Sequence, residues 1–182
     1  IPLVDADRNG ELLERIKSIR RQFALEMGFI VPPLHIRDNL QLKSNEYSVV
    51  IKGVDVARDS IMIGRILAMN PGTTERELDG IKTTEPTFGL PAVWIPDNKK
   101  QEAQMAGFTV VDPATVITTH IKETIKRHAP ELLGRQETQA LLDKFKETNP
   151  KVVEELIPNL LSLGKVQKVL QNLLKEKISI RD

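Results

Sequence analysis

The sequence predicts an α+β fold in which an α/β region comes first and a smaller helical region follows it. Short runs of β-branched residues, separated by glycine and proline turns, occupy the stretch from 34 to 111. Apolar residues at helical spacing flank this stretch on both sides. Beyond Pro130 the helical period is the only signal, so the boundary between the two regions is predicted near 130–135.

An amphipathic helix opens the chain, with Asn9 as its cap and Gly28 at its end. Its apolar residues recur at helical spacing and are Leu12, Ile16, Ile19, Phe23 and Met27. Gly53 divides the next extended region into a hairpin or a bulge, and a short helix is predicted at 99–106. The predicted strands are 34–37, 47–52, 54–56, 61–69, 92–95 and 108–111.

A strong helix-start signal follows the last predicted strand. Asp112 is a capping carboxylate, and Pro113 stands at the first helical position. The helix that they open should bury one apolar stripe along its length, formed by Ile117, Ile121 and Ile125.

The helical region contains three further predicted helices. One spans 134–147, with Glu137 in its first turn, where the helix dipole favours a carboxylate. Asn149 and Pro150 cap a second helix, which should end before Pro158. Ser162 starts a third, whose apolar face is predicted to hold Val166, Val169, Leu170, Leu173 and Leu174.

The composition excludes several classes of protein. A net charge of +1 argues against a general electrostatic grip on nucleic acid or an anionic membrane. The absence of cysteine excludes disulfides, thiol catalysis and cysteine-based zinc sites. No apolar run reaches the length of about 18 residues that a membrane span needs. The chain begins at Ile1 without a methionine and stops within what resembles a new element, so we expect it to be part of a longer protein.

No residue pattern in the sequence indicates catalysis or cofactor binding. His120 and His128 are eight residues apart, about two helical turns, which is too far for two ligands of one metal ion. There is no Gly-x-Ser-x-Gly elbow and no glycine-rich phosphate loop. We therefore expect a protein that is not an enzyme and holds neither a cofactor nor a metal.

Two polar clusters have interpretations that depend on local structure. His35-Ile36-Arg37-Asp38-Asn39 is best explained as a turn in which Asp38 and Asn39 bond the backbone. Arg135, at the start of a predicted helix, is either a surface charge or an interface anchor, and the sequence alone leaves both open.

A helix-turn-helix DNA-binding regulator is an alternative for the helical region. The last predicted helix offers polar residues on one side, namely Lys165, Gln167, Lys168, Gln171, Asn172 and Lys175. The stretch 135–182 carries nine Lys and Arg against seven Asp and Glu, whereas DNA-binding modules are usually far more basic. This alternative is therefore the weaker one.

The segment 85–95 combines an aromatic loop with a strand that holds the only tryptophan. Phe88 lies between Pro86 and Gly89 and is followed by the predicted strand at 92–95, which contains Trp94. Residue type alone favours a core position for Phe88, since phenylalanine is usually buried. A loop braced by proline and glycine also permits an exposed aromatic, and loops on rigid scaffolds often carry function.

Five motifs follow one another along the chain, namely His35–Asn39, Asn70–Gly72, Glu85–Leu90 with Val93–Ile95, Glu131–Glu137 and Val169–Leu174. In this order they closely resemble the cytoplasmic domain of type III export-gate proteins from flagella and injectisomes, the FHIPEP/LcrD family. The resemblance covers essentially the whole chain, and the motifs together are far more specific than any one of them.

The resemblance implies a fragment with three subdomains. Residues 1–63 together with 113–132 would form a first α/β subdomain, split by an inserted α/β subdomain at 64–112. Residues 133–182 would form a helical, winged-helix-like third subdomain that is cut short. The whole protein would add a membrane half, and its cytoplasmic parts would assemble into a ring of nine at the cytoplasmic face of the bacterial inner membrane.

The resemblance also implies partners and a docking site. The partners would be flagellar chaperone–cargo complexes, the export ATPase apparatus and other membrane proteins of the export gate. Chaperone–cargo complexes would dock in a hydrophobic dimple to which Glu85, Phe88 and Thr119 contribute. Glu85 stands where many family members have aspartate, which keeps the charge but extends the side chain by one methylene. An aromatic anchor with a carboxylate and a hydroxyl beside it suits a hot spot for a peptide segment, such as the apolar face of a helix.

Overall fold

The computed structural model describes residues 11–181, and these form two compact units. The first unit comprises Ile36–Thr124 together with the start of the first helix. The second comprises Glu14–His35 and the residues from Ile125 onward. Mixed α and β elements are present, as the sequence predicted, whereas the predicted division into three subdomains stays a prediction.

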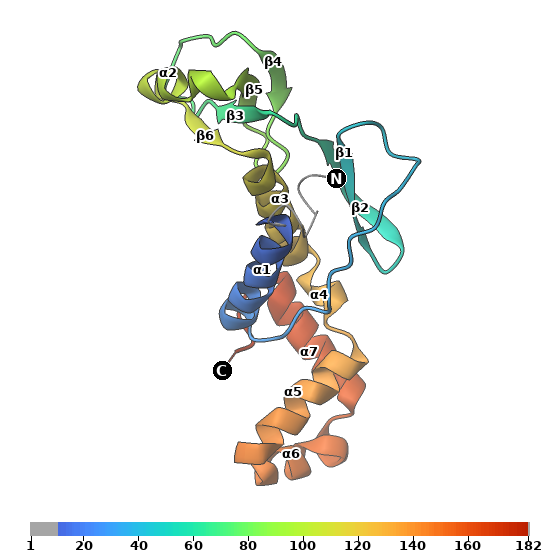
Figure 1. The fold of residues 1–182 in the computed structure, drawn as a ribbon. Helices are drawn as coiled ribbons and strands as arrows, with labels where there is room; N and C mark the ends of the chain where they lie inside the picture. Colours follow the sequence, from blue (N-terminus) through green and yellow to red (C-terminus); the bar gives the residue numbers. More distant parts are fainter. Residues whose placement is uncertain (1–10, 182) are drawn as a thin grey trace. The chain divides into compact units, whose positions relative to one another are not determined.

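A β-hairpin contains the first two strands of the first unit (Figure 1). Strands β1 (Glu46–Ile51) and β2 (Val54–Ser60) pair antiparallel, with a register shift after Val49. Lys52 and Gly53 both have positive φ, the combination that a two-residue turn of the favoured hairpin type requires. Of the two alternatives that the sequence left open at Gly53, the hairpin is therefore confirmed, whereas the bulge lies at the register shift between Val49 and Val50.

The first unit also contains a four-stranded antiparallel sheet in the order β4-β5-β3-β6. Its strands are β3 (Arg65–Met69), β4 (Ile81–Thr84), β5 (Pro91–Pro96) and β6 (Thr109–Val111). A 3-10 turn (Asp97–Lys99) and helix α2 (Lys100–Met105) connect β5 to β6. The whole sheet lies within 64–112, the range expected for an inserted subdomain.

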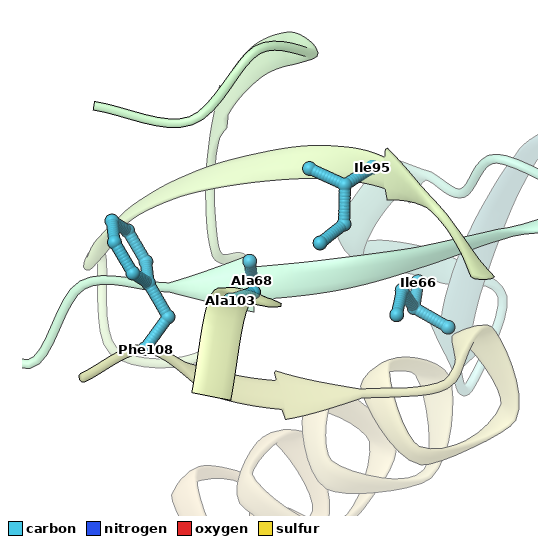
Figure 2. Close-up of a cluster of buried hydrophobic side chains, with 5 residues drawn as sticks. All are labelled: Ile66, Ala68, Ile95, Ala103 and Phe108. Atoms are coloured by element: carbon cyan, nitrogen blue, oxygen red, sulfur yellow. The ribbon is translucent and has the colours of Figure 1, made fainter. Parts of the chain in front are cut away.

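One face of the sheet packs on α2 to make a small hydrophobic core (Figure 2). Ile66 and Ala68 of β3 lie beside Ile95 of β5, and Ala103 of α2 and Phe108 complete the cluster. Because side chains alternate along a strand, the residues between these project from the opposite face. That second face includes Leu67, Met69, Trp94, Thr109 and Val111.

Helix α3 (Pro113–Arg127) follows β6 and starts as the sequence predicted. The carboxylate of Asp112 accepts hydrogen bonds from the backbone N–H and the hydroxyl of Thr115, at 2.8 and 2.7 Å. The predicted apolar stripe of Ile117, Ile121 and Ile125 is buried. Asp112 thus fixes the start of the helix whose first turns reach the second face of the sheet.

The second unit contains helices and irregular segments in its described part. Its helices are α1 (Glu11–Met27, from Glu14 on), the end of α3, α4 (Ala129–Leu132), α5 (Arg135–Thr148), α6 (Pro150–Glu155) and α7 (Leu163–Lys175). A further helical turn, Leu156–Leu160, joins α6 to α7. Leu133 and Leu174 are fully buried, and the Gln171 side chain donates to the Leu133 carbonyl at 2.9 Å.

The end of α1 needs a glycine for two reasons. Gly28 has φ +91°, and a Cβ there would lie 2.3 Å from the backbone nitrogen of Arg181. The nearby backbone N–H of Ile180 donates to the carbonyl of Met27 at 2.9 Å. Gly28 therefore ends the helix as predicted, whereas the predicted cap, Asn9, lies outside the described residues.

Three predictions about strands and helix caps are wrong. Residues 34–37 form no strand: Ile36 is 43% exposed, and the chain before them is held by the Arg20 guanidinium, which donates to the Val31 carbonyl. Two prolines, which lack backbone donors, also precede this segment. The strand predicted at 61–69 begins only at Arg65, because Gly64 turns the chain with φ +75°. Helix α6 starts at Pro150 as predicted, but the Asn149 side chain makes no capping bond.

Several other predictions are confirmed, and two elements were missed. Asn39 bonds the backbone N–H of Gln41, Glu137 accepts from the N–H of Gly134, and Ser162 accepts from the N–H of Lys165. On α7, Val166 and Leu174 are buried, but Val169 is 53% exposed and lies outside the apolar face. Strand β4 and the single turn α4 were not predicted.

Replacing Ile95 by alanine should destabilise the first unit strongly. Ile95 is fully buried in the core of Figure 2, so Ile95→Ala is expected to lower the free energy of unfolding by about 2–5 kcal/mol. Ile81→Ala is the matched control, because Ile81 is 43% exposed on the edge strand β4 and should cost less than about 1 kcal/mol. Urea denaturation measures both, and equal losses would contradict the assignment of the core.

Candidate functional site

An apolar cavity of about 220 Å³ lies in the first unit. Three groups of residues line it: residues on or beside β3 and β6, the Glu85–Leu90 segment that links β4 to β5, and the first turns of α3. The lining residues are Met69, Pro71, Glu85, Phe88, Leu90, Thr109, Val111, Thr115, Val116 and Thr119. The sheet face opposite the α2 core and the start of α3 therefore supply its walls.

The structure brings together the three residues that the family resemblance assigned to a docking site. Glu85, Phe88 and Thr119 all line the cavity, although they come from a loop and from a helix about thirty residues later. Their role in binding stays a prediction. The expectation from residue type, that Phe88 is part of the core, is wrong: Phe88 is 65% exposed, whereas Trp94 is 3% exposed.

A closed turn fixes the backbone on which Phe88 stands. The backbone N–H of Glu85 donates to the Leu90 carbonyl at 2.8 Å, and the N–H of Gly89 donates to the Glu85 carbonyl at 3.0 Å. Gly89 has φ +71°, a conformation that residues with a side chain rarely adopt. Proline and glycine thus brace the turn, as the sequence indicated.

Glu85 lies beneath this turn and is only 3% exposed. One carboxylate oxygen accepts the N–H of Thr87 at 2.9 Å, and the other accepts the N–H of Phe88 at 2.7 Å. Hydrogen bonds from backbone donors satisfy a buried carboxylate that would otherwise be costly to desolvate. The carboxylate expected beside the aromatic anchor is therefore part of the turn itself.

The polar residues of the cavity other than Glu85 are three threonines. Thr115 and Thr119 stand four residues apart on α3, so their side chains share a face of the helix, and Thr109 lies on β6. No lysine, arginine or histidine is among the lining residues. The cavity is accordingly apolar, with hydroxyl groups and one hydrogen-bonded carboxylate on its walls.

Sequence reasoning missed seven of the lining residues. Two signals could have found most of them. Alternation along β3 and β6 separates Met69, Thr109 and Val111 from the core residues, and helical spacing places Thr115 and Val116 beside Thr119. Pro71 and Leu90 lie in connecting segments, where periodicity gives no information.

A tyrosine–histidine pair connects the hairpin to α3 near the cavity. The Tyr47 hydroxyl lies 2.7 Å from Nδ1 of His120, and the two rings meet edge to face. Burial raises the pKa of the Tyr47 phenol well above its usual value, and the neighbouring carboxylates of Asp59 and Glu85 raise it further. His120 is buried in this pair, and no group of His, Cys, Asp and Glu among the described residues is arranged to hold a metal ion.

The FHIPEP family model matches the chain over residues 1–182. The flagellar biosynthesis protein FlhA of Bacillus subtilis is 55% identical over all 182 residues, and the chain spans 27% of that relative's length. None of the helices in the described residues combines the length and apolar character needed to cross a membrane.

Solved structures with the same fold come from type III secretion proteins. The Chlamydia pneumoniae CdsV protein, solved in complex with CdsO, superposes with a TM-score of 0.77 at 24% identity, over 92% of this chain and 52% of that one. The nonameric SctV-C of EPEC, solved by cryo-EM, gives a TM-score of 0.67 at 23% identity, over 94% of this chain and 52% of that one. At these identities the likeness establishes the fold.

Removing the Tyr47 hydroxyl should change how stability depends on alkaline pH. The pKa of Tyr47 is higher in the folded chain than its unfolded value of about 10. The protonated phenol therefore contributes its full share of the unfolding free energy below pH 10, and this share is lost as the pH rises toward the folded pKa. Tyr47→Phe should lower the unfolding free energy by about 1 kcal/mol at pH 8 through the lost hydrogen bond.

The difference between the two proteins should then narrow at pH 10–11, because only the wild-type chain loses the phenol contribution. Urea denaturation at pH 8 and pH 10.5 measures this difference. A constant gap across that range would contradict the assignment of a raised pKa to Tyr47.

Proposed function

The chain belongs to the FHIPEP family, and we propose that it forms part of the cytoplasmic docking platform of a flagellar type III protein export gate. On this proposal the cavity receives a segment of an export chaperone–cargo complex. The observation that supports it is Phe88, an aromatic side chain that is 65% exposed at an apolar cavity and stands on a hydrogen-bonded turn. Such a residue has the properties of a binding hot spot.

The size of the cavity favours side chains of a docked segment over a small-molecule substrate. Pockets that enclose small molecules usually measure about 300–1,000 Å³, and this cavity measures about 220 Å³. Apolar side chains from one face of an amphipathic helix would fit such a space, with the rest of the helix lying across the surface. We propose that the platform is not an enzyme, and the lining residues offer no nucleophile paired with a base.

The charged and polar groups around the cavity limit which kinds of segment can dock there. A buried carboxylate and three threonine hydroxyls line it, with no cationic side chain among the lining residues. A segment that inserts apolar side chains would be accepted, whereas an inserted carboxylate would be repelled by the nearby charge of Glu85, since no cationic side chain lines the cavity to compensate it.

The proposed setting extends beyond this chain, which spans 27% of the length of the Bacillus subtilis relative. In the whole protein we place it at the cytoplasmic face of the bacterial inner membrane, in a ring of nine, next to the export ATPase apparatus and the other gate proteins. The assembly of CdsV with CdsO and the nonameric SctV-C ring support partner binding and oligomerisation of this fold. The alternative of a helix-turn-helix DNA-binding regulator finds no support among these relatives.

Phe88→Ala should weaken partner binding strongly while lowering the stability of the chain only slightly. Because the ring is exposed, its removal is expected to lower the unfolding free energy by less than about 1.5 kcal/mol, against about 3–5 kcal/mol for a core phenylalanine. Loss of a hot-spot aromatic should weaken binding to a purified flagellar chaperone–cargo complex by about 30- to 1,000-fold. Isothermal titration calorimetry and urea denaturation measure the two effects.

Phe145→Ala is the matched control for this experiment. Phe145 is 47% exposed on α5 and does not line the cavity, so its removal should leave the affinity unchanged. Wild-type affinity in Phe88→Ala, or a comparable loss in Phe145→Ala, would refute a docking role for the cavity.

Thr119→Val tests whether a hydroxyl on α3 contributes to docking. Valine keeps the shape of threonine and removes one hydrogen-bonding group, so we expect a loss of about 1 kcal/mol of binding, roughly fivefold in affinity. Thr148→Val, at the end of α5 and outside the cavity, is the control. Equal affinity of Thr119→Val and the wild type would show that the hydroxyl takes no part in docking.

A further inference from the structure

We infer that Glu85 acts in docking as a positioning residue, which holds the Phe88 turn in its binding conformation and does not itself contact the partner. The inference rests on the proposed docking function of the cavity and assigns a specific role to one of its residues. The sequence predicted a carboxylate beside the aromatic anchor and did not distinguish positioning from contact.

The burial of Glu85 is the first reason. The residue is 3% exposed, whereas Phe88, three residues later, is 65% exposed. A docked segment can therefore reach the ring directly, but it meets almost no surface of the carboxylate.

The hydrogen bonds of Glu85 are the second reason. Each carboxylate oxygen accepts one backbone N–H, from Thr87 at 2.9 Å and from Phe88 at 2.7 Å. The acceptor bound to Phe88 thus fixes the backbone of the anchor residue. Hydrogen bonds to a charged acceptor are about twice as strong as neutral ones, so the carboxylate is well suited to hold a tight turn.

The surroundings of Glu85 are the third reason. The carboxylate is close enough to Tyr47 to raise the pKa of its phenol, and Tyr47 pairs with His120 on α3. His120 directly follows Thr119, which lines the cavity. The charge of Glu85 is therefore close to the part-buried pair of Tyr47 and His120, next to the cavity wall.

Amide exchange in Glu85→Gln provides the first test. The glutamine amide offers one acceptor oxygen in place of two, so one of the two N–H groups must lose its partner. Exchange of the Thr87 and Phe88 amides should accelerate about tenfold or more, while the amides of β1 and β2 stay unchanged. Glu85→Asp retains both acceptor oxygens and should stay within about threefold of the wild type in exchange and in affinity.

Glu137→Gln is the matched control. Glu137 also accepts a backbone N–H, that of Gly134 at the start of α5, but it does not line the cavity. Glutamine keeps one acceptor oxygen for this single bond, so Glu137→Gln should leave both the amide exchange of Gly134 and the affinity for the chaperone–cargo complex nearly unchanged.

A double-mutant cycle with Phe88→Ala separates positioning from direct contact. Glu85→Gln should weaken binding to the purified chaperone–cargo complex about tenfold in the wild-type background and less than about twofold in the Phe88→Ala background, because without the ring there is no anchor to position. A tenfold loss in both backgrounds would mean that Glu85 contacts the partner and would overturn the inference. Unchanged exchange of the Thr87 and Phe88 amides in Glu85→Gln would overturn it as well.

The two proposals fail in different ways. Full affinity in Phe88→Ala would refute docking at the cavity, whereas the amide exchange in Glu85→Gln still decides whether the carboxylate holds the turn. If Phe88→Ala loses affinity and the losses in the cycle are additive, docking at the cavity is supported, but the positioning role of Glu85 is refuted.

Discussion

The pair of hydrogen bonds that Glu85 accepts is the constraint on which the proposed site depends. Leaving a phenylalanine exposed forgoes about 1.5–3 kcal/mol that burial of the ring would contribute. Hydrogen bonds to a charged group each contribute about 1.5–3 kcal/mol, so the two bonds from Thr87 and Phe88 to Glu85 can offset that loss. The turn therefore holds an apolar ring at the surface that would otherwise favour the interior.

The sheet provides the rigid support for this turn. Ile66, Ala68 and Ile95 face α2 and form a core. On the opposite face of the sheet, Met69, Thr109 and Val111 line the cavity. Asp112 fixes the start of α3, which places Thr115 and Thr119 on the adjacent wall. One set of alternating strand residues thus stabilises the unit while the other set shapes the surface proposed to bind a partner.

Local signals in the sequence predicted the elements that local chemistry determines. The turn at Gly53, the capping carboxylate of Asp112 and the stripe from Ile117 to Ile125 depend on neighbours within a few residues, and all are present. The strand predicted at 34–37 is absent because pattern alone cannot reveal whether a pairing strand is available. Strand β4 was missed since an exposed edge strand shows little apolar alternation.

Local sequence signals were not enough to predict the candidate site. Residue type placed Phe88 in the core, and only the resemblance to a family indicated that Glu85, Phe88 and Thr119 belong together. Their convergence on one cavity is a property of the tertiary fold, since about thirty residues separate the loop from the helix. The burial of Glu85 had no sequence signal, because its partners are backbone N–H groups, which every residue except proline carries.

Hydrogen exchange of the chain, measured with and without a purified flagellar chaperone–cargo complex, tests the central claim most directly. If the complex docks at the cavity, protection should appear at 85–90 and 109–119, while β1, β2 and α7 exchange as in the free chain. Protection confined to α5, α6 and α7, with no change around Phe88, would contradict the account.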